Sequence, residues 1–136
     1  SQELMENWLN TADPAVIADL DLIVTHDDEI VDGITTVIQG TDALTSLSLI
    51  TSVGGRRETL STYDGIEKPA LVTYFFSPSF IREALRLAVA AEKGETYQGQ
   101  EVNGQLFLIP TIEIDKSTVE AFRQSQEYID RYSIAD

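Results

Sequence analysis

Several residue types that build common kinds of site are missing or scarce in this chain. Its 136 residues include no cysteine, which excludes disulfide scaffolds, thiolate metal sites and cysteine nucleophiles within them. Histidine occurs once, at His26, so no site here can use two imidazoles. Lys and Arg number 9 against 23 Asp and Glu, for a net charge of −14. Such a chain lacks the clustered basic side chains that nucleic acids and anionic lipids bind.

Long apolar runs are also missing. No segment approaches the roughly 18 uninterrupted apolar residues of a membrane span, so we expect no membrane insertion. The first residues, Ser1 to Glu6, are polar and acidic and do not resemble a signal peptide. Hydrophobic residues nevertheless make up 43% of the chain. This length and composition predict a single folded domain over residues 1–136 with a buried core.

Short apolar segments alternate with segments of helical periodicity. Because the expected strands are apolar almost throughout, they are typical of parallel strands buried on both faces. We therefore predict an α/β fold of three layers, a parallel sheet with helices on both faces. The strands are expected at 22–25, 47–53 and 70–76, with a loop or hairpin at 99–104 and an edge strand or connection at 105–114. The helices are expected at 1–10, 14–20, 30–40, a short stretch ending near 62, 78–94 and 118–132.

Ligands of open parallel sheets bind beyond the carboxyl ends of the strands, which selects three segments. The first is His26 to Glu29, at the start of an expected helix. Carboxylates there cap free N–H groups and complement the helix dipole. Consecutive acids on a helix cannot all face one ion, so we expect no metal site. Asp27, nearest the strand end, is the best-placed acceptor for ligand hydroxyls, with His26 beside it.

The second segment is Gly54-Gly55-Arg56-Arg57. The glycines fit a tight strand-to-helix turn, or a turn that lets a ligand approach the backbone. Arg56 could pair with a ligand carboxylate or phosphate, although two arginines among so many acids more often form surface ion pairs. The segment has neither the Lys-Ser/Thr of a P-loop nor the glycine spacing of a dinucleotide site, so no cofactor is expected.

The third segment is Tyr74-Phe75-Phe76-Ser77, in which the three aromatic side chains alternate across the sheet. At least one is expected in the core, and an aromatic side chain at a strand end can stack on a sugar ring. Tyr74 and Phe76 therefore join Asp27, His26, Gly54 and Arg56 as candidate ligand-binding residues. No Gly-x-Ser-x-Gly elbow or other catalytic arrangement is present, so we do not expect an enzyme.

The order of these segments resembles a known family. This chain resembles the periplasmic sugar-binding proteins of the ribose and galactose type in the strand-to-helix segment 22–33 (LIVTHDDEIVDG) and in the helix that precedes it at 8–20. It also resembles them in the strand and glycine turn of 47–55, in the strand and Pro-started helix of 69–94, and in the closing strand of 104–114. Their type 1 periplasmic-binding fold has two α/β lobes joined by three crossovers. The resemblance implies that this chain is the C-terminal lobe plus the last crossover segments of a longer protein.

The resemblance also implies a function. The protein is expected to bind a sugar or similar solute outside the cytoplasm for an ABC importer, without catalysis, and to meet the ABC permease as its partner. It would be periplasmic or extracellular, a cell-surface lipoprotein included. Two alternatives share the fold: the effector-binding domain of a Lac-repressor-like regulator, and a small-molecule sensor domain. A lone lobe would also expose the surface meant for its partner, so self-association is a further hypothesis.

Ligand residues carry over in part. Asp27 matches a position where the family places an Asn or Asp that hydrogen-bonds a sugar hydroxyl. The acidic residue that the family places after the next strand is missing, because Ser52-Val53-Gly54-Gly55 stands there. Phe76 or its neighbour occupies the place of a polar contact. These departures favour a less hydroxylated ligand, or one held by Arg56 or Arg57.

Overall fold

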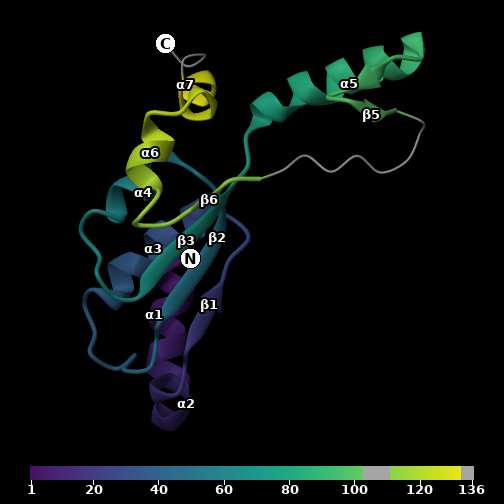
Figure 1. Ribbon diagram of the computed structural model, residues 1–136. Coiled ribbons are helices and arrows are strands. Elements are labelled where there is room, and N and C mark those ends of the chain that lie inside the picture. Colours follow the sequence, from purple (N-terminus) through teal and green to yellow (C-terminus); the bar gives the residue numbers. More distant parts are fainter. Residues whose placement is uncertain (103–110, 133–136) are drawn as a thin grey trace.

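Three parallel strands form the centre of the sheet in the computed structural model, which describes residues 1–102 and 111–132 (Figure 1). They are β1 (Leu22–Val24), β2 (Leu49–Gly54) and β3 (Ala70–Phe75). A short fourth strand, β6 (Glu113–Ile114), runs antiparallel beside β3, and the strand order is β1-β2-β3-β6. The predicted parallel α/β sheet is therefore present, with one antiparallel edge strand.

The helices begin and end close to the positions that the sequence predicts. Asp13 and Asp27 each cap a helix, because their side chains accept a hydrogen bond from the backbone N–H two residues later. The helices of the main body are α1 (Gln2–Thr11), α2 (Pro14–Ala18), α3 (Asp28–Ile38), α4 (Arg57–Thr62), α6 (Val119–Arg123) and α7 (Gln126–Tyr132).

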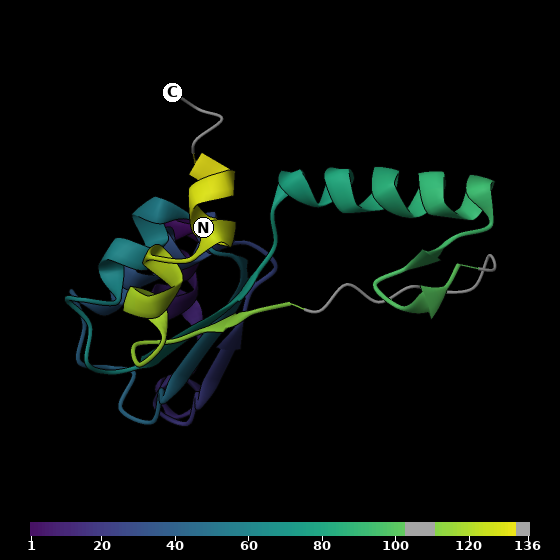
Figure 2. The same ribbon diagram turned by 45° about the horizontal axis from the view of Figure 1, so that its top comes forward.

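The hydrophobic core lies between one face of the sheet and the helices α3, α4 and α6. Figures 1 and 2 show these helices gathered on one side of the strands, with α1 packed against α3. Each strand contributes every second residue to this core, and each of these helices contributes the apolar residues of one side. The buried core residues are Val31, Ile34, Leu47, Ile50, Leu60, Tyr63, Leu71, Phe75, Ile114, Val119 and Phe122.

The prediction of helices on both faces of the sheet is wrong for the described part of the chain. Residues that alternate with the core positions remain in solvent, with Leu22 46% and Val24 67% exposed on β1. Val53 on β2 and Tyr74 on β3 are also exposed. The strands have the composition of a doubly covered sheet, but helices of the described residues cover one face, so the described part of the fold has two layers.

The segment after β3 leaves the body as an arm, which we define as residues 78–101. It consists of a 3₁₀ turn (η1, Pro78–Phe80), the helix α5 (Ile81–Lys93) and the hairpin of β4 (Thr96–Tyr97) and β5 (Gln100–Glu101). Gly94 ends α5 in the left-handed conformation, with φ 66°. Figures 1 and 2 show α5 extending away from the sheet, with the hairpin alongside it.

One prediction near the C-terminus differs from the structure. The single helix expected over 118–132 is split, because the backbone N–H groups of Gln124 and Ser125 bond to Ala121 and Phe122 in tight turns that end α6. The edge strand expected within 105–114 is present at Glu113–Ile114, where it forms an edge of the sheet. Residues 103–110 lie outside the described residues.

Candidate functional site

The carboxyl edge of the parallel strands gathers the candidate ligand-binding residues. His26 and Asp27 come directly after β1, and Gly54 is the last residue of β2. Tyr74 lies near the end of β3 and Phe76 follows it. Parallel strands end at the same edge, so residues far apart in sequence meet there. This edge divides into a polar part beside α3 and an aromatic part beside the arm.

The polar part begins with Asp27, the N-cap of α3. Its Oδ1 accepts a hydrogen bond of 2.8 Å from the backbone N–H of Glu29. The Asp27 side chain is exposed, as is His26 before it. Asp27 therefore serves the helix through one carboxylate oxygen, and the other carboxylate oxygen can accept a hydrogen bond from a ligand.

Asp28, the next residue, points into the protein and is fully buried. One carboxylate oxygen accepts hydrogen bonds from the hydroxyls of Ser52 (2.5 Å) and Thr73 (2.8 Å). The other accepts a bond of 2.7 Å from the backbone N–H of Arg56. Asp28 thus joins the start of α3 to β2, to β3 and to the turn before α4. Its place at a helix N-terminus was predictable, whereas its burial depends on partners 24 to 45 residues away in the chain.

Arg56 lies in a cluster of carboxylates. Its guanidinium is 3.2 Å from Glu29, 3.6 Å from Asp32 and 3.3 Å from Glu58. Partial burial lowers the pKa of Arg56, but the surrounding carboxylates outweigh it and raise the pKa above its usual value. The surface ion pairs that the sequence favours for this arginine are therefore present, and its charge is already balanced within the chain.

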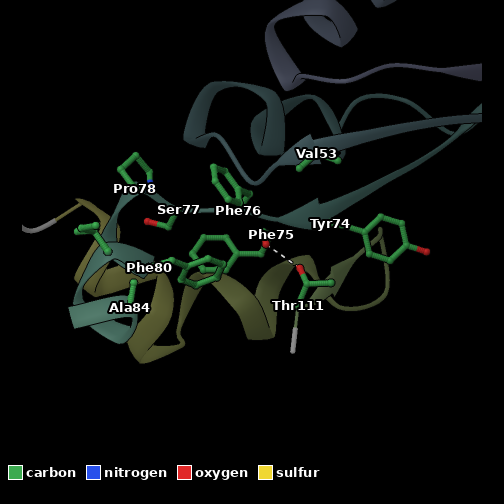
Figure 3. Close-up of a pocket in the computed structure, with 10 residues that line it drawn as sticks. Val53, Tyr74, Phe75, Phe76, Ser77, Pro78, Phe80, Ala84 and Thr111 are labelled. Atoms are coloured by element: carbon green, nitrogen blue, oxygen red, sulfur yellow. Dashed lines mark hydrogen bonds between the residues drawn. The ribbon is translucent and has the colours of Figure 1, made fainter. Parts of the chain in front are cut away.

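The aromatic part is a groove of about 720 Å³ where the arm leaves the body (Figure 3). Figure 3 shows Phe76 and Phe80 on its wall, with Val53 and Tyr74 at the strand end. Phe80 packs edge-on against both Phe75 and Phe76, with ring centroids 5.5 and 5.9 Å apart. The groove is lined by Val53, Tyr74, Phe75, Phe76, Ser77, Pro78, Phe80, Ile81, Ala84 and Thr111.

Few polar groups enter this groove. The Thr111 hydroxyl donates to the backbone oxygen of Phe75 at 2.6 Å, and the buried Ser77 hydroxyl accepts from the backbone N–H of Ser79. Tyr74 donates its hydroxyl to Glu113 at 2.8 Å, and that bond raises the pKa of Tyr74. An apolar wall with a few fixed polar groups is typical of small-molecule sites, and flat rings suit the apolar face of a sugar.

The structure thus separates the six candidate residues. Tyr74 and Phe76 line the groove, whereas Asp27, His26, Gly54 and Arg56 lie in the polar part of the same edge. Sequence reasoning missed Phe80 and Thr111, and it did not single out Val53 or Ser77 as a lining residue, although Ser77 belongs to the third segment. The position of Ser77 just after a strand is the signal that placed it in that segment.

No cluster of three or more His, Asp or Glu side chains is placed to hold a metal ion among residues 1–102 and 111–132. In the same part of the chain, no helix has both the length and the apolar character needed to cross a bilayer. The candidate site consists of an aromatic groove beside an acidic, ion-paired edge.

Comparisons with known proteins support the fold. No protein-family model matches the chain, and no curated protein matches it. A solved structure from Mycobacterium smegmatis, of a protein in complex with β-D-fucofuranose, is similar with a TM-score of 0.58 at 16% sequence identity. The match covers 93% of this chain and 38% of that one. The chain therefore shares an α/β fold with part of a larger protein.

Proposed function

We propose that this chain is one ligand-binding lobe of an extracytoplasmic solute-binding protein, and that the ligand is a sugar or a sugar-like polar solute. The observation that carries the proposal is the aromatic groove beyond the carboxyl ends of β2 and β3. It lies where the ligands of open parallel sheets bind, and its walls suit a ring with one apolar face.

Different residues of this edge make different contacts with the ligand in this proposal. The exposed ring of Phe76 stacks on the sugar, and the free lone pairs of Asp27 accept hydrogen bonds from its hydroxyls. Arg56 is neutralised by three carboxylates, so it does not select for an anionic ligand. A neutral ligand with one apolar face is the class that fits.

The mechanism we propose is binding without catalysis. Ligand would stabilise one arrangement of this lobe against a second lobe, and an ABC permease would respond to that arrangement. The chain is similar to part of a larger protein whose structure was solved with a furanose sugar, and this similarity supports the proposal. The acidic composition is consistent with a partner other than nucleic acid.

A thermal-shift screen followed by calorimetry tests the ligand class. The chain is mixed with D-fucose, D-galactose, L-arabinose, D-ribose and short polyols, with L-glutamate as an anionic comparison. We expect a rise in melting temperature with at least one neutral sugar and none with L-glutamate, because binding to the native state alone stabilises it. A chain that responds to none of the sugars at millimolar concentrations contradicts the proposal.

Asp27 offers a matched test of the ligand contact. Asp13 and Asp27 are both exposed N-caps that accept a backbone bond of 2.8 Å, so Asp13→Ala controls for the lost cap. Asp27→Ala is expected to weaken sugar binding by more than about 1 kcal/mol, the value of one neutral hydrogen bond. Asp13→Ala leaves affinity unchanged. Equal affinities for the two variants would remove Asp27 from the site.

A further inference from the structure

The aromatic groove has almost no hydrogen-bonding capacity of its own. Of the ten residues that line it, only Tyr74, Ser77 and Thr111 have a polar side-chain atom, which is a hydroxyl oxygen in each case. Thr111 donates to the backbone oxygen of Phe75, and Tyr74 donates to Glu113. Ser77 is 1% exposed, so its hydroxyl is closed off from a molecule in the groove. Among the described lining side chains, no hydroxyl proton is therefore left within reach of a ligand.

This shortage of partners determines which part of a ligand the groove can hold. A free sugar has a hydroxyl group on nearly all of its carbon atoms. A hydroxyl that leaves water for an apolar site loses free energy unless it finds a new hydrogen-bond partner there. The lone pairs of Tyr74 and Thr111 are too few for the hydroxyls of a whole sugar. The groove therefore suits a part of the ligand that has no hydroxyls.

The size of the groove and the rings in its wall favour an aromatic group. Its volume of about 720 Å³ is within the range of small-molecule sites. Phe80 meets Phe75 and Phe76 edge-on, with ring planes at 90° and 89° to its own. Aromatic rings prefer such edge-on contacts to direct face-to-face stacking. Figure 3 shows the three rings together in the wall, where a further aromatic ring can pack on them in the same way.

Phe76 connects this groove to the polar part of the edge. Its backbone N–H bonds to the oxygen of Gly54 at 3.1 Å, and its ring centroid is 5.9 Å from that of Phe80. Asp27 follows β1, which lies two positions from β3 in the strand order. Two strand spacings measure about 10 Å. A sugar held between Asp27 and Phe76 therefore has one end at the opening of the groove.

We propose that the ligand is a neutral glycoside with an aromatic aglycone, and that the aglycone occupies the aromatic groove. This inference rests on the proposed function and adds the chemistry of the second half of the ligand. The sugar lies between Asp27 and Phe76, where its hydroxyls meet carboxylate oxygens and water. The aglycone lies beyond Phe76, against Phe80, Ile81 and Ala84. A sugar without an aglycone leaves these apolar walls in contact with water.

Calorimetry with matched glycosides tests for the aglycone. The probes are the methyl and phenyl glycosides of D-galactose, D-fucose and L-arabinose, each as both anomers. At least one phenyl glycoside is expected to bind about tenfold more tightly than its methyl counterpart, because the phenyl group buries more apolar surface and adds contacts between rings. Equal affinities within every pair overturn the inference, leave the groove as a surface for packing against protein, and leave the proposed function standing. Binding of none of these sugars or glycosides contradicts the proposed function itself.

Two substitutions on α5 locate the aglycone. Ala84→Phe places a ring inside the groove, whereas Ala88→Phe, one turn later on the same helix, changes an equally exposed class of residue outside it. Ala84→Phe is expected to abolish the preference for the phenyl glycoside, and Ala88→Phe is expected to keep it. Circular dichroism establishes that both variants are folded. A phenyl preference that persists in Ala84→Phe, or that both variants lose, places the aglycone elsewhere and overturns the inference.

Discussion

Gly54 approaches the carboxylate of Asp28 so closely that a β-carbon at position 54 would lie 2.7 Å from Oδ2. The same carboxylate holds Ser52, Thr73 and the backbone of Arg56. The turn after β2 and the start of α3 are therefore fixed to each other through one buried acid. This contact sets the shape of the polar part of the candidate site.

Gly54→Ala is expected to destabilise the protein by about 2 kcal/mol, because the new methyl group meets the carboxylate and the backbone has φ 152°. Urea unfolding followed by circular dichroism measures this loss. Gly65→Ala is the control, since a β-carbon there has its nearest neighbour 3.9 Å away, at Thr62. Similar stabilities for the two variants would contradict the close contact.

Asp28→Ala is expected to cost roughly 3 kcal/mol of unfolding free energy, since it leaves two hydroxyls and one buried N–H without their acceptor. Asp27→Ala, one residue earlier, removes only a helix cap and should cost about 1 kcal/mol. Chemical denaturation of both variants gives the comparison. An equal loss of unfolding free energy at the two positions would show that Asp28 does not hold α3 to the two strands.

Phe76→Ala is expected to weaken ligand binding at least tenfold while changing stability by less than about 1 kcal/mol, because the ring is 58% exposed. Phe75→Ala, at a neighbouring core ring that is 2% exposed, should cost about 3–5 kcal/mol of stability. Calorimetry and denaturation together separate the two effects. Sugar affinity that is unchanged in Phe76→Ala would remove this ring from the site.

Asp32 gives a prediction of pH dependence. Burial, with the like charges of Asp28 and Glu58, raises the pKa of Asp32 above 3.8, although Arg56 opposes the shift. The folded state then binds this proton more tightly than the unfolded chain. The contribution of Asp32 to stability is full below pH 3.8 and is lost as pH rises through the raised pKa.

Asp32→Asn should therefore gain stability relative to the wild type as pH rises across that window. Denaturation at several pH values on both sides of it measures the difference, with Asp42→Asn at an exposed position as the control. A difference between Asp32→Asn and the wild type that does not change with pH contradicts the raised pKa.

The sequence predicts the helices and strands well where a proline, a glycine or a capping aspartate determines where they begin or end. Pro78 and Gly94 bracket the segment that forms η1 and α5, and Asp13 and Asp27 cap helices as expected. These residues act through their own backbone geometry or through bonds to near neighbours. Their effect can be read without knowing the rest of the fold.

Long-range relationships could not be read in the same way. Asp27 and Asp28 are chemically identical neighbours, yet one is exposed and the other buried, because Ser52 and Thr73 lie beside only the second. The apolar rows of β1 and β2 indicate that both faces of the sheet are meant to be covered. In the described residues, helices cover only one of these faces, and Leu22 and Val24 on the other face are exposed.

The groove lies beside a junction between two segments that are far apart in the sequence. The backbone N–H of Phe75 bonds to the oxygen of Ile112, and the Thr111 hydroxyl bonds to the oxygen of Phe75. The end of β3 and residues 111 and 112 are therefore held together beside the groove. Val53 and Tyr74 of the groove belong to the body, whereas Ile81 and Ala84 belong to the arm. A molecule held in the groove therefore contacts the body and the arm at the same time.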